Sequence, residues 1–381
     1  MTNELIKGFR DYTEEEARKR AEIKKIIVDV FEKYGFEPTE TPVIESEEFV
    51  KGENPNDEAV SDIYKLQDKG KRKLALRYEF TFQLKRLMKN KKLPWKRYQI
   101  GEVFRDEPVQ GNRLRQFTQC DADVVGSTIK DEAEILAMTK EILLKLKIKP
   151  VILIGNRKLL NEILEEQCIE KKYWEQVLRE IDKYDKLPET QVIKNLKKFG
   201  ADKILKCLKQ GEKYFSKFES YKEVFELMKY CDYYGVKILF SPTIVRGFSY
   251  YNGNVFEIKS GEIKETIVAG GSYEFNDVRC TGISFGLDRL ASLAKIKTGK
   301  EKYLIVSLGQ DKKATKLTQK LRRQNKSASI YYGKPSKALQ YANSYNINKV
   351  IFVGENEVKS KKFKVKDMTS GYTKPLRRPL F

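Results

Sequence analysis

The sequence predicts an α+β protein in which a helical segment interrupts a sheet domain and a separate α/β domain follows. Strand and turn patterns fill residues 98–125 and 236–285, whereas residues 157–230 are almost wholly helical in pattern and hold little Gly or Pro. After the linker-like Lys295–Lys300, short apolar runs alternate with helical segments, which is typical of an α/β unit with a largely parallel sheet. The expected divisions are the sheet domain in two parts (1–155 and 231–297), the helical insertion (156–230) and the C-terminal α/β domain (301–381).

Periodicity predicts the elements of the sheet domain in chain order. An amphipathic helix ends at about Lys33, before Gly35, and an extended segment punctuated by prolines follows it. The next elements are a hairpin at 63–77, strands at 98–104 and 117–125 around a polar loop, a helix at 131–147, a short strand at 151–154, and, after the helical segment, strands within 236–258 and 265–285.

The chain of 381 residues contains no histidine, which excludes any mechanism that needs a protein imidazole as base, nucleophile or metal ligand. Metal binding then falls to carboxylates, which suits Mg²⁺ bound together with a phosphate substrate. Five cysteines without Cys-x-x-Cys spacing favour reduced thiols in a cytosol. No apolar run has the length of a membrane helix, and the N-terminal residues lack a secretory pattern, so a cytoplasmic location is expected.

The positive charge of the chain is unevenly placed. The net charge is +21, and residues 301–381 alone carry 19 Lys and Arg against 5 Asp and Glu. A lysine-rich composition explains part of the excess but not its concentration in one segment. We therefore expect a polyanion as partner, with RNA or DNA favoured over a membrane surface.

Three segments combine residue types that are typical of a binding site. Val245–Glu257 joins Arg246 to the pair Tyr250-Tyr251 and to Asn252-Gly253, which is a hairpin turn signal. Taken alone, this segment also fits an ordinary surface hairpin.

The second segment is the polar loop between the strands 98–104 and 117–125. Arg105 lies where a guanidinium can reach a phosphate, Phe117 offers an aromatic face to a purine ring, and Glu107 can accept a hydrogen bond from an exocyclic amine. The alternative is a long hairpin with a charged tip.

The third segment is Gly282–Leu290, in which a strand with two glycines leads into a helix. Arg289 lies in the first helical turn, and an arginine there suits a triphosphate or a nucleotide base. Close packing of strand and helix explains the glycines equally well.

Together these segments resemble the class II aminoacyl-tRNA synthetases. Pro42 lies at the centre of a segment similar to their first signature, and FRDEPVQGNRLRQF and GISFGLDRL resemble the second and third. Further segments resemble the histidyl-tRNA synthetase family within that class: KGFRD, LALRYEFT, RQFTQCDADVVG, IGNRKLL and VRGFSYYNGNVFE. The resemblance runs from about Lys7 to the C-terminus. It implies an antiparallel sheet in the catalytic domain and an anticodon-binding α/β domain at the end.

The resemblance also implies roles for individual residues. Arg105 and Arg246 would hold the α-phosphate and carboxylate during reaction, and Arg289 would pack on adenine. The expected ATP-binding set is Arg105, Glu107, Arg113, Arg115, Phe117 and Arg289, of which Arg113 and Arg115 would also reach the acceptor stem. Glu79, Thr81 and Gln119 would surround the α-amino group of histidine, Asp123 and Tyr251 would take the imidazole nitrogens, and Tyr250 would line the same pocket.

The implied partners are histidine, ATP with Mg²⁺, tRNA(His) and a second copy of the chain, since the first signature forms the dimer interface in this class. No residue of the chain is assigned to a metal site. Three positions depart from the family pattern: Tyr78 for Pro, Ser249 for Asp and Ser272 for Arg.

Two other functions fit parts of the sequence. One is a non-catalytic paralogue, either a regulatory subunit of histidine biosynthesis or a sensor of uncharged tRNA. Such paralogues tend to lose the ATP-binding arginines or the anticodon domain, and this chain retains both. The other is a general RNA-binding protein, which would leave the tyrosine pair and the arginines without a role.

Overall fold

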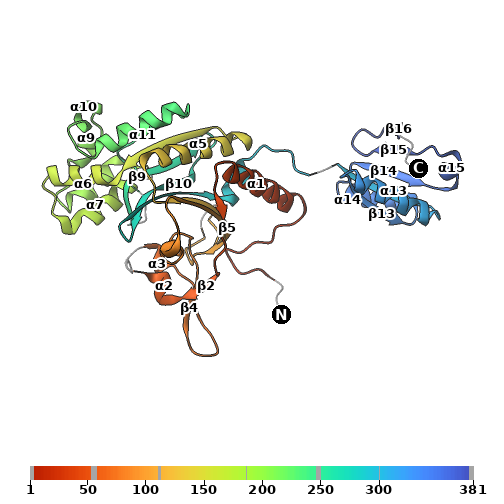
Figure 1. Ribbon diagram of the computed structural model, residues 1–381, viewed down its shortest axis with the longest axis horizontal. Helices are drawn as coiled ribbons and strands as arrows, with labels where there is room; N and C mark the ends of the chain where they lie inside the picture. The colour runs from red at the N-terminus through yellow and green to blue at the C-terminus, as the bar shows by residue number, and fades with distance from the viewer. Residues whose placement is uncertain are drawn as a thin grey trace. The chain divides into compact units, whose positions relative to one another are not determined.

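The computed structural model describes residues 4–52, 58–109, 113–185, 187–245, 250–299 and 301–376. The chain divides into two compact units, Met1–Lys297 and Thr298–Phe381 (Figure 1). Among the described residues, no helix has both the length and the apolar composition needed to cross a membrane.

The first unit is built on an eight-stranded sheet. Its strands, in spatial order, are β1 (Glu37–Pro38), β5 (Trp95–Phe104), β6 (Gln116–Val125), β11 (Val278–Gly286), β10 (Ile263–Phe275), β9 (Tyr251–Ser260), β7 (Pro150–Asn156) and β8 (Leu239–Phe240). The six central strands pair antiparallel, whereas β1 pairs parallel with β5 and β8 pairs parallel with β7 at the two edges. The expected antiparallel sheet is therefore confirmed for the central strands.

Three helices cover one face of this sheet: α1 (Glu14–Lys33), α5 (Ile129–Lys145) and α12 (Leu287–Leu293). Alternate residues of β6 explain the packing, because Cys120, Ala122 and Val124 are fully buried in the core that the helices complete. The ring of Phe31 on α1 lies 5.9 Å from the ring of Phe285 on β11. The opposite face of the same strands carries polar side chains.

A run of helices joins β7 to β8. It comprises α6 (Arg157–Glu166), a 3-10 turn η2 (Lys171–Tyr173), α7 (Trp174–Asp182), α8 (Glu189–Lys197), α9 (Ile204–Leu208), α10 (Glu212–Phe215) and α11 (Tyr221–Tyr233). Their apolar residues, such as Leu160, Val177 and Leu227, belong to the same buried cluster as the helix-covered face of the sheet. The helical run therefore shares one hydrophobic core with the eight-stranded sheet.

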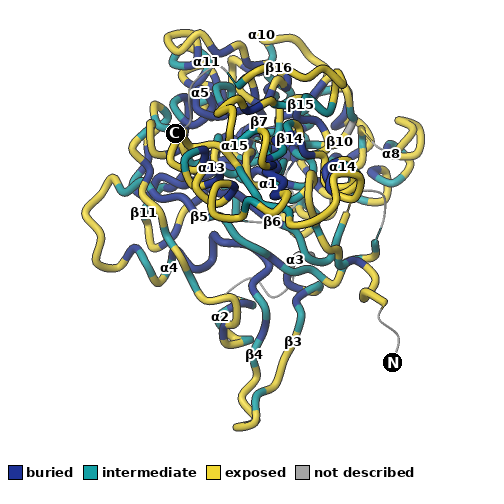
Figure 2. Tube along the Cα trace, turned by 90° about the vertical axis from the view of Figure 1, so that its right-hand side faces the viewer, coloured by how far each residue is buried: buried dark blue, intermediate teal, exposed yellow. Residues whose placement is uncertain are grey.

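A small antiparallel sheet of β2 (Ile44–Ser46), β4 (Lys73–Leu76) and β3 (Lys65–Gln67) precedes β5. The short helices α2 (Glu47–Lys51), α3 (Glu58–Ser61) and α4 (Leu84–Leu87) and the 3-10 turn η1 (Met88–Asn90) belong to the same region. The tip of the hairpin between β3 and β4 is exposed (Figure 2). The predicted hairpin at 63–77 is confirmed.

The Asn252-Gly253 pair lies inside β9, so the prediction of a hairpin turn there is wrong. The pairing of β9 with β10 shifts register between Gly271 and Tyr273, opposite this pair. A Cβ atom on Gly253 would lie 2.3 Å from Ser272 Oγ. Close approach of two strands at a bulge, and not a turn, explains the glycine.

The second unit has its own five-stranded sheet. The strands, in spatial order, are β13 (Ser327–Tyr332), β12 (Lys302–Ser307), β14 (Lys349–Val353), β15 (Lys364–Asp367) and β16 (Thr373–Pro375). The first three are parallel and the last two pair antiparallel, with α13 (Asp311–Arg323), α14 (Pro335–Ser344) and α15 (Glu355–Ser360) between strands. This arrangement confirms the predicted α/β unit, but its sheet is mixed, because two of the four strand pairings are parallel and two are antiparallel.

Candidate active site

The face of the large sheet away from α1, α5 and α12 gathers polar side chains from neighbouring strands. Along β6, Gln119, Asp121 and Asp123 alternate with the core residues, and all three are buried. The register of β5 places Arg97 directly opposite Asp123, and the register of β11 places Ser284 opposite Asp121. Strand pairing therefore brings two carboxyl groups, a guanidinium and a hydroxyl into one buried cluster, which we call the polar face.

Asp123 is held by donors from both sides. Arg97 Nη2 lies 2.8 Å from Asp123 Oδ2, and the Tyr273 hydroxyl donates to Asp123 Oδ1 at 2.6 Å. Burial raises the pKa of Asp123, while the charge of Arg97 and the hydrogen bond from Tyr273 act to lower it. The two donors fix the orientation of this carboxyl group.

Asp121 has a different environment on the same strand. Ser284 Oγ lies 2.5 Å from Asp121 Oδ1, and Gln119 Nε2 donates to Ser284 Oγ at 2.7 Å. Burial raises the pKa of Asp121 to about 8, and neighbouring Asp123 adds to this effect. Asp121 therefore carries a proton at neutral pH. Gln119 Oε1 is buried and accepts no hydrogen bond from the described residues, which suits an acceptor for a ligand amine.

Glu79 and Thr81 lie between β4 and α4 and belong to the same cluster. Glu79 accepts hydrogen bonds from the Phe82 backbone N–H at 3.0 Å and from the Tyr250 hydroxyl at 3.3 Å. Burial raises the pKa of Glu79, whereas hydrogen bonds from Thr81 and Phe82 and the charge of Arg105 lower it. The residues expected to surround an α-amino group thus include a buried carboxyl group.

Tyr250 and Tyr251 form the side of the cluster at the start of β9. Their ring centroids are 4.7 Å apart, and the Tyr250 ring lies 5.6 Å from that of Tyr273. Burial raises the pKa of Tyr250, so its phenol remains a neutral donor. A Cβ atom on Gly271, which has φ +158, would lie 2.9 Å from Tyr251 Cδ1, so glycine makes room for this ring.

Arg105 follows β5 at the edge of the cluster. Its Nε donates to the Tyr78 carbonyl at 3.1 Å, and its guanidinium carbon lies 5.1 Å from the centroid of the Phe117 ring. Glu107 Oε1 is 4.0 Å from Arg105 Nη1. The arginine, the aromatic ring and the carboxylate named as nucleotide-binding candidates therefore lie together.

The loop that follows is fastened by the N-terminal segment. Arg113 Nη1 lies 3.3 Å from Glu107 Oε2, and Arg115 Nη2 lies 3.1 Å from Asp106 Oδ1. The Arg115 backbone N–H donates to the Gly8 carbonyl at 2.9 Å. Gly8 has φ +91, and a Cβ atom there would lie 2.8 Å from Arg115 Cγ. The Arg113 side chain is 61% exposed, so it is accessible to a ligand as large as an RNA.

Arg289 lies in the first turn of α12, and its Nη1 donates to the carbonyl of Thr266 on β10. Its neighbour Asp288 accepts hydrogen bonds from Arg20 Nη1 and from the Tyr12 hydroxyl, each at 2.5 Å. The start of α12 is thereby tied to α1 and to β10.

Arg246, a candidate catalytic residue, and Ser249 lie outside the described residues. The remaining candidates are two adjoining groups and Arg289. The amino-acid group is Glu79, Thr81, Gln119, Asp123, Tyr250 and Tyr251, the nucleotide group beside it is Arg105, Glu107, Arg113, Arg115 and Phe117, and Arg289 is held on β10.

Sequence reasoning missed four residues of the polar face: Arg97, Asp121, Tyr273 and Ser284. A period of two along β5 and β6 could have found the first two, because it puts Arg97 and Asp121 on the same faces as Gln99 and Asp123. The burial of Arg97 could not be predicted, because no sequence pattern indicates that the loop at Phe80 covers it. The Phe80 carbonyl accepts a hydrogen bond from Arg97 at 3.2 Å.

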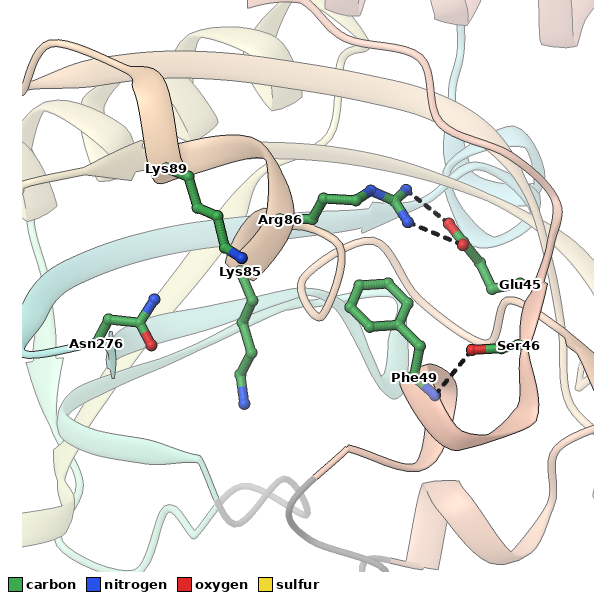
Figure 3. Close-up of a pocket in the computed structure, with 7 residues that line it drawn as sticks. All are labelled: Glu45, Ser46, Phe49, Lys85, Arg86, Lys89 and Asn276. Atoms are coloured by element: carbon green, nitrogen blue, oxygen red, sulfur yellow. Dashed lines mark hydrogen bonds and ion pairs between the residues drawn. The ribbon is translucent and has the colours of Figure 1, made fainter.

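A cavity of about 500 Å³ lies elsewhere in this unit and holds none of the candidate residues (Figure 3). It is lined by Glu45, Ser46, Phe49, Lys85, Arg86, Lys89 and Asn276. Within it, Arg86 makes two hydrogen bonds of 2.9 and 2.8 Å to the Glu45 carboxylate, as Figure 3 shows. The polar face is the better candidate site, because its buried ionisable groups have shifted pKa values.

Comparison with known proteins matches the family model described as histidyl-tRNA synthetase to residues 8–290. The histidine--tRNA ligase 1 of Bacillus cereus is 33% identical over 411 residues, which cover 97% of this chain and 94% of that protein. The chain belongs to the histidyl-tRNA synthetase family. Residues 302–378 match a second model, the anticodon binding domain.

Solved structures agree with membership of the histidyl-tRNA synthetase family. The crystal structure of histidyl-tRNA synthetase from Nostoc sp. PCC 7120 has a TM-score of 0.85 and 26% identity, and the match covers 99% of this chain and 97% of that one. A structure from Bacillus halodurans, described as an ATP phosphoribosyltransferase regulatory subunit/histidyl-tRNA synthetase, has a TM-score of 0.77 and 20% identity, covering 92% of this chain and 98% of that one. At 20% identity the likeness shows the fold alone.

Proposed function

We propose that this chain joins histidine to ATP as histidyl-adenylate and then transfers the histidyl group to the 3′ end of tRNA(His). Family membership supports the reaction class, and one observation of the structure carries the amino-acid assignment. Glu79, Asp121 and Asp123 lie buried close together, and the Arg97 cation is ion-paired with Asp123. A ligand that brings an ammonium group and a ring N–H complements this excess of acceptors.

Glu79, Thr81 and Gln119 surround the α-ammonium group in this proposal, and Asp123 and Tyr251 take the imidazole nitrogens beside Tyr250. The acceptor and the phenol reject an apolar ring of the same size, because a buried polar group left unpaired costs about 1–3 kcal/mol. The Asp123 carboxyl, fixed by Arg97 and Tyr273, is the centre of this discrimination.

ATP binds in the nucleotide group. Phe117 and Arg289 hold the adenine ring, Glu107 accepts from its amino group, and Arg113 and Arg115 reach the phosphates. A carboxylate oxygen of histidine attacks the α-phosphorus, and pyrophosphate leaves. Arg105 and Arg246 stabilise the negative charge that develops, so that positioning and fixed charge provide catalysis without a protein imidazole.

Among the described residues, no group of three or more Cys, Asp or Glu side chains is placed to hold a metal ion. In this proposal magnesium enters as part of the MgATP substrate, held chiefly by phosphate oxygens. No step depends on a protein metal site.

The second half-reaction involves the tRNA. Its 3′-terminal ribose hydroxyl attacks the histidyl carbonyl carbon, and AMP leaves. The basic residues 301–381 bind the anticodon region, and Arg113 and Arg115 contact the acceptor stem.

We also propose the four-part domain division given above, a cytoplasmic location, and a homodimer formed through the segment at Pro42, where Val43 and Ile44 are 40% and 49% exposed.

Pyrophosphate exchange with each of the twenty amino acids tests the proposal. Exchange with histidine alone is the expected result. Folded protein that binds tRNA but exchanges with no amino acid would instead indicate a paralogue that senses uncharged tRNA. Exchange with another amino acid would show that the polar face has been assigned to the wrong ligand.

A further inference from the structure

Arg97 is the most deeply buried charged side chain of the polar face, with 0% of its surface exposed. An arginine cannot lose its proton in a protein, so its burial must be compensated by an anion. Asp123 Oδ2 supplies that anion at 2.8 Å, and the Phe80 carbonyl accepts a second hydrogen bond from the same Nη2 at 3.2 Å. Nε and Nη1 have no hydrogen-bond partner among the described residues.

The ion pair with Arg97 also affects the ionisation of the Asp123 carboxyl group. Several ionisable groups face this carboxyl: Arg97 on β5, Tyr273 on β10, Cys280 on β11, Asp121 on its own strand and Glu79 from the loop after β4. Burial opposes ionisation of Asp123, and the charge of Arg97 is the largest effect that favours it. Without Arg97, the pKa of Asp123 would rise further.

Geometry gives Arg97 a second effect. Its direct cross-strand position opposite Asp123 fixes Oδ2, while Tyr273 fixes Oδ1. Gly282, opposite Asp123 on β11, has no side chain to occupy the space at Oδ1, where a Cβ atom would come within 2.0 Å. The carboxyl is thus held in one orientation with one side left uncovered by a side chain at position 282.

We propose that Arg97 is a positioning residue for histidine recognition, and that its guanidinium keeps Asp123 ionised and correctly oriented to accept the imidazole N–H. This inference rests on the proposed function, in which Asp123 faces the imidazole ring. Arg97 itself acts through Asp123 and is not assigned a contact with the substrate. A purely structural role, in which the pair only joins β5 to β6, predicts lost stability without a pH-dependent loss of affinity.

The test is the dissociation constant for histidine, measured by calorimetry from pH 6.5 to 8.5 for the full chain and for Arg97→Gln. We expect weaker binding by about tenfold for each unit by which the pKa of Asp123 in the variant exceeds the assay pH. The ratio of the variant's dissociation constant to that of the natural protein should therefore fall as the pH rises. The titration of free histidine affects both dissociation constants equally, so its effect cancels in this ratio. Arg97→Lys, which keeps the positive charge, should restore most of the affinity and a flat ratio.

Arg279→Gln is the matched control. Arg279 Nη2 lies 2.6 Å from the fully buried Glu132 on the helix-covered side of the sheet, and the Arg279 side chain is 30% exposed, so its loss also breaks a partly buried ion pair. We expect this control to lose thermal stability with an unchanged affinity for histidine at every pH. If Arg97→Gln behaves like the control, the positioning role is wrong.

The double variant Arg97→Met/Asp123→Asn covers the case in which Arg97→Gln does not fold, because it removes both buried charges together. We expect it to bind histidine more weakly than the natural protein, with a ratio that is independent of pH. Affinity equal to that of the natural protein would overturn the inference. Histidine binding by natural protein that shows no pyrophosphate exchange would refute the proposed function and leave the Arg97 test intact, whereas natural protein that binds no histidine overturns both.

Discussion

Gly282 pairs directly with Asp123 between β11 and β6, and a Cβ atom on Gly282 would lie 2.0 Å from Asp123 Oδ1. A distance of this size is far inside van der Waals contact. Either the carboxyl group must leave its position between Arg97 and Tyr273, or the strands must separate. Glycine at this position is therefore required by the place of the Asp123 carboxyl group.

The first prediction concerns that glycine. Gly282→Ala should raise the KM for histidine at least about tenfold, since displacement of Asp123 that removes only 1.4 kcal/mol of binding has this effect. Overpacking should also lower the free energy of unfolding by about 1–3 kcal/mol. Pyrophosphate exchange and denaturant unfolding measure the two effects.

Gly261→Ala is the control for this substitution. Gly261 lies in the turn between β9 and β10, and nothing lies within 4 Å of its Cβ position. It should leave the KM for histidine unchanged. An equal KM in both alanine variants would contradict the spatial argument.

The second prediction concerns pH and Asp121. Burial raises the pKa of Asp121 in the folded chain to about 8, well above the ordinary value of an aspartate side chain. The folded state therefore holds an extra proton between about pH 4 and pH 8, and the stability that this proton contributes is lost as the pH rises towards 8. Asp121→Asn cannot titrate, so its melting temperature should rise relative to that of the natural protein between pH 5 and pH 8. The difference in free energy of unfolding between the variant and the natural protein should change by at most about 1.4 kcal/mol per pH unit.

Asp367→Asn provides the contrast. Asp367 is hydrogen-bonded by Lys349 and by the Ser370 backbone, and these contacts lower its pKa. Its contribution is present above its unfolded pKa and is lost only in acid, so the Asp367→Asn difference should stay constant between pH 5 and pH 8. Melting curves of Asp121→Asn that follow those of the natural protein at every pH would show that Asp121 is ionised in the folded chain.

The third prediction concerns the anchoring of α12. Arg20 and Asp288 keep 9% and 17% of their side chains exposed, and Asp288 also accepts from Tyr12 and from the Thr118 backbone N–H. Removal of one partner from a buried pair costs about 3–5 kcal/mol, and the partial exposure here reduces the expected loss for Asp288→Asn to about 2–4 kcal/mol. Urea unfolding measures the loss. Asp29→Asn, which removes the exposed pair with Lys25, should change stability very little.

The fourth prediction concerns the C-terminal unit. Removal of residues 301–381 deletes a separate compact unit with a large excess of positive charge. Affinity for tRNA should fall sharply, and the slope of its logarithm against the logarithm of salt concentration should become shallower. Exchange of pyrophosphate with histidine should persist. If the folded truncation loses exchange, the proposed division between catalytic and anticodon-binding domains is incorrect.

Much of this architecture could be predicted from local patterns. The strand predicted at 117–125 is confirmed as β6, although the alternation along it, which would have placed Asp121 beside Gln119 and Asp123, was not used. Arg97 was missed, since a charged residue in a strand normally faces solvent and its burial depends on a loop distant in sequence. Asn252-Gly253 was interpreted as a turn because the same two residues serve a turn and a bulge, and only the partner strand distinguishes these cases.

The two faces of β6 have a consequence for the way this gene can change. Neighbouring positions of β6 have different roles. Cys120, Ala122 and Val124 pack in the helix-covered core, whereas the residues between them form the polar face. A complete substitution scan should therefore alternate along residues 119–124 between variants that fold but do not select histidine and variants that do not accumulate. Repacking of the core therefore need not alter the polar face, and new side chains on the polar face need not alter the core.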